Sequence, residues 1–182
     1  MKALLIVFLL ATAACLVVAS CSSATYKSAP FTLASREGTF EIRDYPALTV
    51  ATTRRGTDND SFMRLFRYIG GANEKKESIS MTTPVLMTGD EMSFVMPAPL
   101  QTGTPKPASD DVRIKTLPPR RFAVYRYSGR SIPANERAAL AKLTEWLDAR
   151  HLKHSAEAVV AYYDPPWTLP PLRHNEVMLP LN

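Results

Sequence analysis

The chain has 182 residues, of which 46% are hydrophobic, and a formal net charge of +5 at pH 7. This length suits one domain with a sizeable core, and a positive charge this mild and diffuse does not indicate a nucleic-acid-binding protein. The sequence carries no motif of a serine hydrolase, a zinc protease or a P-loop enzyme, so we expect a binding protein and not an enzyme.

The first twenty residues have the pattern of a bacterial lipoprotein signal peptide. Lys2 supplies a short positive region, residues 4–18 are apolar, and the segment Val18–Cys21 (VASC) matches a lipobox, in which the cysteine becomes the lipidated first residue. The alternatives are an ordinary secretory signal or a transmembrane helix, for which the apolar stretch is short. With Cys15 removed and Cys21 lipidated, the mature chain has no free thiol, which excludes a disulfide framework, a zinc–cysteine site and a cysteine nucleophile.

The residues after the signal are small and polar. We expect residues 21–38 to be the lipidated cysteine and a tether, followed by one domain over residues 39–182. A serine after the lipidated cysteine is compatible with sorting to the outer membrane of a Gram-negative cell. We therefore expect a lipid-anchored cell-envelope protein on the periplasmic face of the outer membrane, with the inner membrane as the alternative.

The clearest helical signal lies between Ser61 and Met87. Apolar side chains recur there at i, i+3, i+4 and i+7, which places one apolar stripe on a helix. The side chains of residues 58–60 can accept hydrogen bonds from its first amides, and Gly70-Gly71 ends it. The four residues of the predicted stripe are Phe62, Leu65, Phe66 and Ile69.

Strands are predicted on both sides of this helix. Alternating apolar positions predict strands over residues 40–45 and 48–53 before it. Residues 79–87 and 91–96 are extended after it, and Pro84 indicates an edge or a bulge because proline cannot donate a ladder hydrogen bond. Residues 97–111 contain four prolines and form a loop between two halves.

The second half repeats the pattern of the first. Ile114-x3-Pro118 resembles Ile42-x3-Pro46, a second and longer helix is predicted over residues 135–150, and residues 177–180 resemble residues 94–97. The order strand-strand-helix-strand-strand thus occurs twice, unless these short patterns match by chance. A duplication of this kind predicts an α+β fold with two pseudo-symmetric halves whose sheets meet around a concave surface.

Several motifs occur in a fixed order from about Phe40 to the C-terminus. Together they resemble the SOUL haem-binding family. The resemblance implies a distorted antiparallel β-barrel or paired sheets with two helices packed outside, a relationship to GyrI-like ligand-binding modules, and reversible binding of haem or another tetrapyrrole in a hydrophobic cleft. The motifs are Tyr45-Pro46, Tyr68-Ile69-x-Gly71-x-Asn73, Ile79-x-Met81-Thr82-x-Pro84-Val85, Phe94-Val95-x-Pro97, Tyr162-x-x-Pro165-Pro166 and Arg173-x-Asn175-Glu176-Val177.

A haem site needs an apolar slot, cations for the propionates and, optionally, an axial ligand. The resemblance places the cleft near the first helix, where Arg64 and Arg67 lie, with Lys75 just after it. A solvated charged face is the alternative for these cations. Met81 either lines the site or fills the core. His174 stands where the family usually has a second arginine, and it is a candidate haem-iron ligand or a structural histidine.

Glu176 is the most informative single residue. If Val177 and Leu179 face a helix-covered core, strand alternation places Glu176 on the opposite, concave face. There it can bind a cationic or aromatic molecule, or act with a tyrosine as the general base of a hydrolase, as in a GyrI-like pocket. Alternatively it hydrogen-bonds Asn175 and Arg173 to hold the last strand. A third possibility is an interaction protein without a small ligand.

Overall fold

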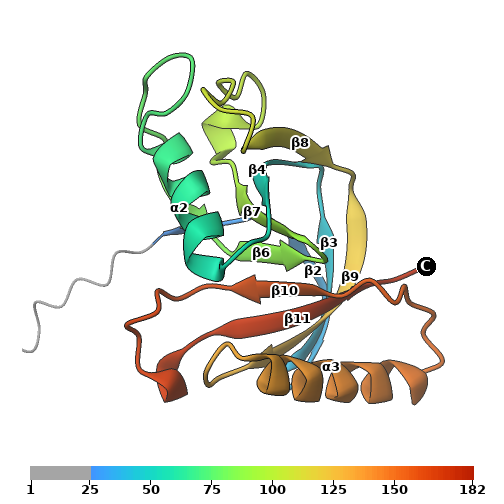
Figure 1. The fold of residues 1–182 in the computed structure, drawn as a ribbon. Coiled ribbons are helices and arrows are strands. Elements are labelled where there is room, and N and C mark those ends of the chain that lie inside the picture. The colour runs from blue at the N-terminus through green and yellow to red at the C-terminus, as the bar shows by residue number, and fades with distance from the viewer. Residues whose placement is uncertain (1–25) are drawn as a thin grey trace, which may run out of the picture.

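The computed structural model describes residues 26–182. Nine of its strands build one curled antiparallel sheet with two α-helices on its outer side, and two short strands form a separate parallel sheet (Figure 1). Within residues 26–182 no helix is both long and apolar enough to cross a membrane. The elements are β1 (Lys27–Ser28), β2 (Thr32–Glu37), β3 (Phe40–Tyr45), β4 (Leu48–Arg54), α2 (Asp58–Ile69), β5 (Thr82–Thr83), β6 (Val85–Thr88), β7 (Glu91–Val95), η1 (Ala98–Leu100), β8 (Arg113–Leu117), β9 (Arg120–Tyr127), α3 (Pro133–Asp148), β10 (Val159–Tyr162), η2 (Pro170–Leu172) and β11 (Asn175–Pro180).

The strand order confirms the predicted duplication and the α+β fold. In the described part of the chain, nine strands pair in the order β2-β3-β9-β11-β10-β6-β7-β4-β8. From the centre outward, β10, β11 and β9 of the second half correspond to β6, β7 and β4 of the first. The next strand on each side comes from the other half, since β3 pairs with β9 and β8 pairs with β4. This exchange of first strands joins the two halves in one sheet.

Alternation along the strands divides the core between the two faces of this sheet. Ala51 and Phe94 pack beneath α2, whereas their neighbours Val50 and Val95 belong to the cluster on the concave face. The second half repeats this arrangement, with α3 on β9 and β11. Each helix therefore covers the outer face of its own half, as predicted, and the concave face is lined by both halves (Figure 1).

Helix α2 differs from the prediction at its start and in its buried face. Its N-cap is Thr57, whose Oγ1 accepts from the Asp60 amide at 3.1 Å, so the expected capping by the side chains of residues 58–60 is wrong. Phe66, predicted to be buried, is 48% exposed, and Tyr68 takes a buried position instead. Tyr68 tolerates burial because its hydroxyl donates to the carbonyl oxygen of Pro105 at 2.8 Å.

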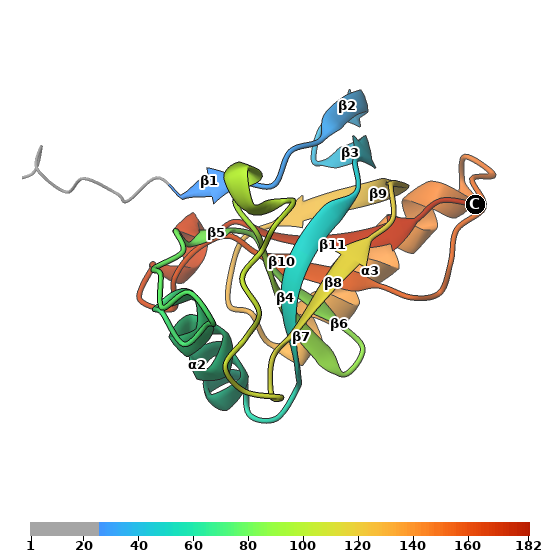
Figure 2. The same ribbon diagram turned by 90° about the horizontal axis from the view of Figure 1, so that it is seen from above.

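The folded domain includes residues that were predicted to form the tether. Strand β2 pairs with β3, and β1 pairs in parallel with β5, so much of the expected tether up to residue 38 belongs to the fold (Figure 2). All six side chains of β2 are exposed, and the strand therefore lacks the apolar alternation by which strands are predicted. The predicted signal peptide and Cys21 lie outside the described residues.

Candidate functional site

Strand β11 places Glu176 on the concave face of the sheet, as predicted. Val177 and Leu179 pack beneath α3, and Met178 joins the concave cluster. Glu176 lies on the same side as Met178 and has no exposed surface. A buried carboxylate must be satisfied by partners, because its charged form is costly to remove from water. Those partners decide what Glu176 can do.

Three side chains satisfy the Glu176 carboxylate. Two nitrogens of Arg43, Nη1 and Nη2, donate to Oε2 and Oε1, each at 2.8 Å. The hydroxyl of Tyr163 donates to Oε2 at 2.9 Å, and Nε2 of His174 lies 2.7 Å from Oε1. An ionised carboxylate only accepts, so Nε2 carries the proton in this contact. The His174 ring stacks on Tyr163 with centroids 4.0 Å apart, which fixes its orientation.

Arg43 connects Glu176 to a longer row of charges. Its Nε donates to Glu41 Oε2 at 2.5 Å, and Glu41 Oε1 accepts from Arg36 Nε at 2.7 Å. The Phe31 ring covers the Arg43 guanidinium, with the ring centroid 4.3 Å from Cζ. Arg43 is buried and Arg36 is exposed, so positive and negative groups alternate from the protein surface inward to Glu176.

The ion pair sets the charge state of Glu176. Burial alone would raise the pKa of this carboxyl, but hydrogen bonds from His174 and Arg43 and the charge of Arg43 outweigh it and lower the pKa to about 2. Burial would lower the pKa of Arg43, yet its bond to Glu176 leaves that pKa raised. Glu176 is thus charged but too weak a base for catalysis at neutral pH. The expected GyrI-like pocket required Glu176 to face an open cavity, and that condition is not met.

Asn175 and Arg173, the expected local partners of Glu176, form hydrogen bonds with other groups. The Asn175 side chain donates to the Gly129 carbonyl oxygen at 3.1 Å, and Arg173 Nε donates to the Thr168 carbonyl oxygen at 2.8 Å. The proposed Asn175 and Arg173 partners are therefore wrong. Glu176 secures β11 through Arg43 on β3, with β9 lying between these two strands.

A small apolar cavity lies farther along the concave face. Its volume is about 190 Å³, whereas pockets that enclose drug-sized ligands measure about 300–1,000 Å³. It is too small to enclose a tetrapyrrole, and Glu176 does not line it. Its lining comprises Ala29, Tyr45, Pro46, Leu48, Pro84, Leu86, Thr88, Val95, Leu117, Pro118, Arg120, Phe122, Glu157, Val159, Met178 and Pro180.

Arg64, one of the predicted propionate-binding cations, is already engaged in the fold. Its Nε donates to Thr53 Oγ1 at 3.0 Å, and its Nη2 donates to the Arg54 carbonyl oxygen at 2.5 Å. These bonds join α2 to the end of β4. Arg64 is therefore a structural residue, and a ligand would have to compete with its backbone and hydroxyl partners.

The other candidates near α2 are spread over different surroundings. Arg67 is exposed, its Nε donates to the Met63 carbonyl oxygen at 3.2 Å, and within residues 26–182 its guanidinium forms no ion pair. Lys75 is exposed in the turn after the helix, and Met81 packs partly buried against the core beneath α2. Of the predicted residues, the fold brings Glu176 and His174 into direct contact and leaves Arg67 available on a separate helix.

The sequence analysis missed an apolar face next to Arg67. Met63 and Phe66 are 40% and 48% exposed on α2. The Phe62 and Phe66 rings lie 5.8 Å apart at an interplanar angle of 16°. We call Phe62, Met63, Phe66 and Arg67 the α2 flank. The apolar residues of the α2 flank are visible in the sequence, and helical spacing places Phe66 on the predicted buried stripe. Spacing does not determine how far a helix is rotated on its sheet, and in the structure the rotation leaves Phe66 exposed.

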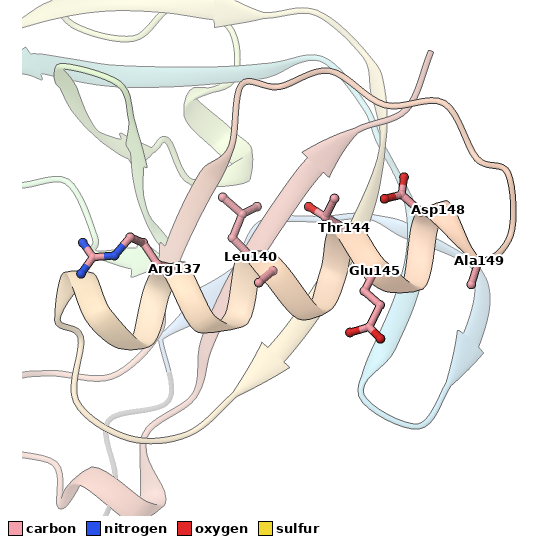
Figure 3. A pocket seen from close by; sticks show the side chains of 7 residues that line it. Arg137, Leu140, Thr144, Glu145, Asp148 and Ala149 are labelled. Carbon is pink, nitrogen blue, oxygen red and sulfur yellow. The ribbon is translucent and has the colours of Figure 1, made fainter.

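A second surface, on α3, is shallow and open (Figure 3). All its residues come from that single helix and its C-cap, so no second element walls it in. It mixes basic, acidic and small side chains and offers no slot for a flat apolar molecule. The residues are Arg137, Leu140, Ala141, Thr144, Glu145, Asp148 and Ala149.

Comparison with known proteins identifies the family. Residues 26–180 match the SOUL heme-binding protein family. Heme-binding protein 1 of Xenopus tropicalis is 26% identical over 155 residues, covering 76% of this chain and 81% of that protein. Heme-binding protein 2 of Homo sapiens is 29% identical over 170 residues, covering 83% and 82%. The chain therefore belongs to the SOUL family, as its motifs indicated.

Solved structures of bacterial proteins share the fold. The C-terminal domain of EcmrR has a TM-score of 0.59 at 14% identity, covering 84% of this chain and 98% of that one. A hydrolase from Listeria innocua has a TM-score of 0.59 at 10% identity, covering 82% and 94%. At such low identity the similarity shows the fold alone.

Proposed function

We propose that this SOUL-family protein binds haem or a related tetrapyrrole reversibly on the α2 flank and acts as a buffer or carrier, not as a catalyst. The observation that carries the proposal is the exposed Phe66 ring, which lies nearly parallel to the partly buried Phe62 ring. Beside it lie Met63 and Arg67, whose guanidinium forms no ion pair within residues 26–182. The two curated relatives named for heme binding support the ligand class.

The α2 flank offers the chemistry that a flat, anionic macrocycle requires. Phe66 supplies an exposed ring for stacking, and residues three apart on a helix are surface neighbours, so Met63 lies beside it. The Arg67 guanidinium can pair with a propionate carboxylate. A thioether is also a known axial ligand of haem iron, which gives Met63 a second possible role. An open face of this kind favours weak, reversible binding.

Two other places fit the ligand less well. The concave cavity of about 190 Å³ can admit no more than an edge of the macrocycle. His174 is held by Glu176 through Nε2, so iron ligation by this atom requires the loss of a contact to a buried carboxylate. Arg67 and Met63 therefore replace His174 as the residues on which we base the site.

The cellular setting we propose follows from the sequence. The lipobox ending at Cys21 supports a lipid anchor in the cell envelope, and the serine after it supports the periplasmic face of the outer membrane. Cys21 precedes the first described residue, Tyr26, by five positions, so the anchor would hold the domain close to the bilayer.

The test is a visible-absorbance titration of the full chain in lipid nanodiscs with hemin and with iron-free protoporphyrin, using empty nanodiscs as the blank. We expect saturable one-to-one binding of both, weakened in Phe66→Ala and in Arg67→Ala. A shift of the hemin Soret band that Met63→Leu abolishes identifies Met63 as the axial ligand, and one that His174→Ala abolishes identifies His174. Arg137→Ala on α3 is the matched control for an exposed arginine.

The proposal fails if neither tetrapyrrole saturates the protein. It also fails at this location if Phe66→Ala and Arg67→Ala bind like the unmodified chain while circular dichroism shows that both are folded. In the first case an interaction protein without a small ligand becomes the better interpretation, with the exposed α2 flank as its contact surface.

A further inference from the structure

The connection between β10 and β11 carries the three most exposed large hydrophobic side chains of the described chain. We call residues 165–173 the apolar loop. Trp167, Leu169 and Leu172 are 79%, 66% and 72% exposed, more than any other large hydrophobic residue in residues 26–182. Exposed apolar groups of this size gathered on one short segment indicate a binding surface, whereas single exposed hydrophobics are ordinary.

The apolar loop is held in place by its own hydrogen bonds. Arg173 donates through Nε to the Thr168 carbonyl oxygen at 2.8 Å and through Nη2 to the Pro166 carbonyl oxygen. The Pro170 carbonyl oxygen accepts from the Gly129 amide at 2.9 Å. These three carbonyl oxygens are satisfied within the protein, which lowers the cost of moving them into a medium with little water. The loop therefore has a defined conformation, and its apolar side chains are exposed in that conformation.

The apolar loop lies at the end of the molecule where the chain enters. Ser28 of β1 pairs with Thr83, and Val85, two residues later, pairs with Tyr162, which directly precedes the connection to the loop. Both views place β1 and this connection on the same side (Figures 1 and 2). Tyr26, at the start of the described chain, is itself 39% exposed.

We propose that the apolar loop inserts into the membrane interface next to the lipid anchor. The orientation rests on the proposed lipidation of Cys21, since five residues span at most about 18 Å and keep Tyr26 near the bilayer. Tryptophan favours the headgroup level, and leucine favours the acyl boundary. Arg130, exposed and adjacent to Gly129, adds attraction to anionic headgroups. The domain is thus held at the membrane by two contacts in a defined orientation.

Bromolipid quenching of tryptophan emission tests this inference. The full chain is reconstituted in phosphatidylethanolamine–phosphatidylglycerol vesicles with ordinary or brominated acyl chains. The protein has two tryptophans, and Trp146 lies in the cluster beneath α3, so the difference between the unmodified chain and Trp167→Phe reports on Trp167 alone. We expect loss of Trp167 emission in brominated vesicles, and recovery of emission when Leu169 and Leu172 are both replaced by serine.

Equal emission of Trp167 in both kinds of vesicle overturns the inference. Mass spectrometry of the N-terminal peptide separately tests lipidation of Cys21. If Cys21 carries no lipid, the anchor proposal fails, and the same chain is added to preformed vesicles. Quenching of Trp167 there still supports insertion by the loop, and its absence overturns it. Hemin titration of the Leu169→Ser/Leu172→Ser variant is expected to match the unmodified chain, which keeps this result separate from tetrapyrrole binding.

Discussion

Arg43 and Glu176 are 133 residues apart in the sequence, and two nitrogens of the guanidinium donate to both oxygens of the carboxylate at 2.8 Å. The first residue lies on β3, from the first half, and the second on β11, from the second half. Their ion pair thus reinforces the exchange of strands that joins the halves. A carboxylate that is neutralised in this way is a structural group of the concave face.

Removing Arg43 is expected to destabilise the protein strongly. Arg43→Leu leaves a buried carboxylate without its cation, which costs about 3–5 kcal/mol of unfolding free energy. The double variant Arg43→Leu/Glu176→Leu is expected to recover much of that loss, because no unpaired buried charge remains. Urea denaturation followed by circular dichroism measures both. A single variant that loses less than about 1 kcal/mol, typical of an exposed pair, would contradict the assignment.

Acid is expected to weaken the fold through Glu176. Its pKa is lowered from 4.5 to about 2, so between these values the unfolded chain binds more protons and stability rises with pH. The contribution is complete above pH 4.5 and is lost as pH falls toward 2, with a size of about 3 kcal/mol. The urea midpoint measured across this window checks it. Glu176→Gln should flatten this part of the pH profile, and an unchanged slope would argue against the mechanism.

The start of α2 gives a test of which side chain caps the helix. Thr57→Ala removes the acceptor for the Asp60 amide and is expected to cost about 1 kcal/mol. Asn59→Ala is the control, since the sequence offered Asn59 as an equally good acceptor and Thr57 occupies the cap. Thermal denaturation of the two variants compares them. A larger loss of stability in Asn59→Ala than in Thr57→Ala would indicate that Asn59, and not Thr57, is the capping residue.

Arg64 and Arg67 are expected to separate stability from ligand binding. Arg64→Ala loses hydrogen bonds to Thr53 and to the Arg54 backbone, so it should lower the unfolding free energy by about 1–3 kcal/mol. Arg67→Ala should leave stability nearly unchanged and weaken hemin binding about fivefold, equivalent to about 1 kcal/mol. Denaturation and hemin titration of both variants give the comparison. If Arg64→Ala weakened hemin binding and Arg67→Ala lowered stability, the ligand would lie on the Arg64 side of α2.

Local patterns predicted most of the secondary structure. The strand β3 over residues 40–45 was predicted with the bounds that it has, and the helix predicted over residues 135–150 agrees with α3 to within two residues at each end. The α2 flank was not found, because helical spacing identifies which residues share a face and leaves open which face meets the sheet. Strand β2 was missed because its pairing rests on backbone hydrogen bonds and none of its side chains is buried.

The sequence by itself determined the duplicated order of elements and the position of Glu176 on the concave face. These features depend on periodicities of two and 3.6 residues, which are properties of neighbouring residues. Only the tertiary structure decided that Arg43 neutralises Glu176, that Phe66 is exposed and that the apolar loop lies beside the point of chain entry. Each of these depends on which distant segments pack together. The spacing of neighbouring residues does not indicate which charged residues on different strands will pair.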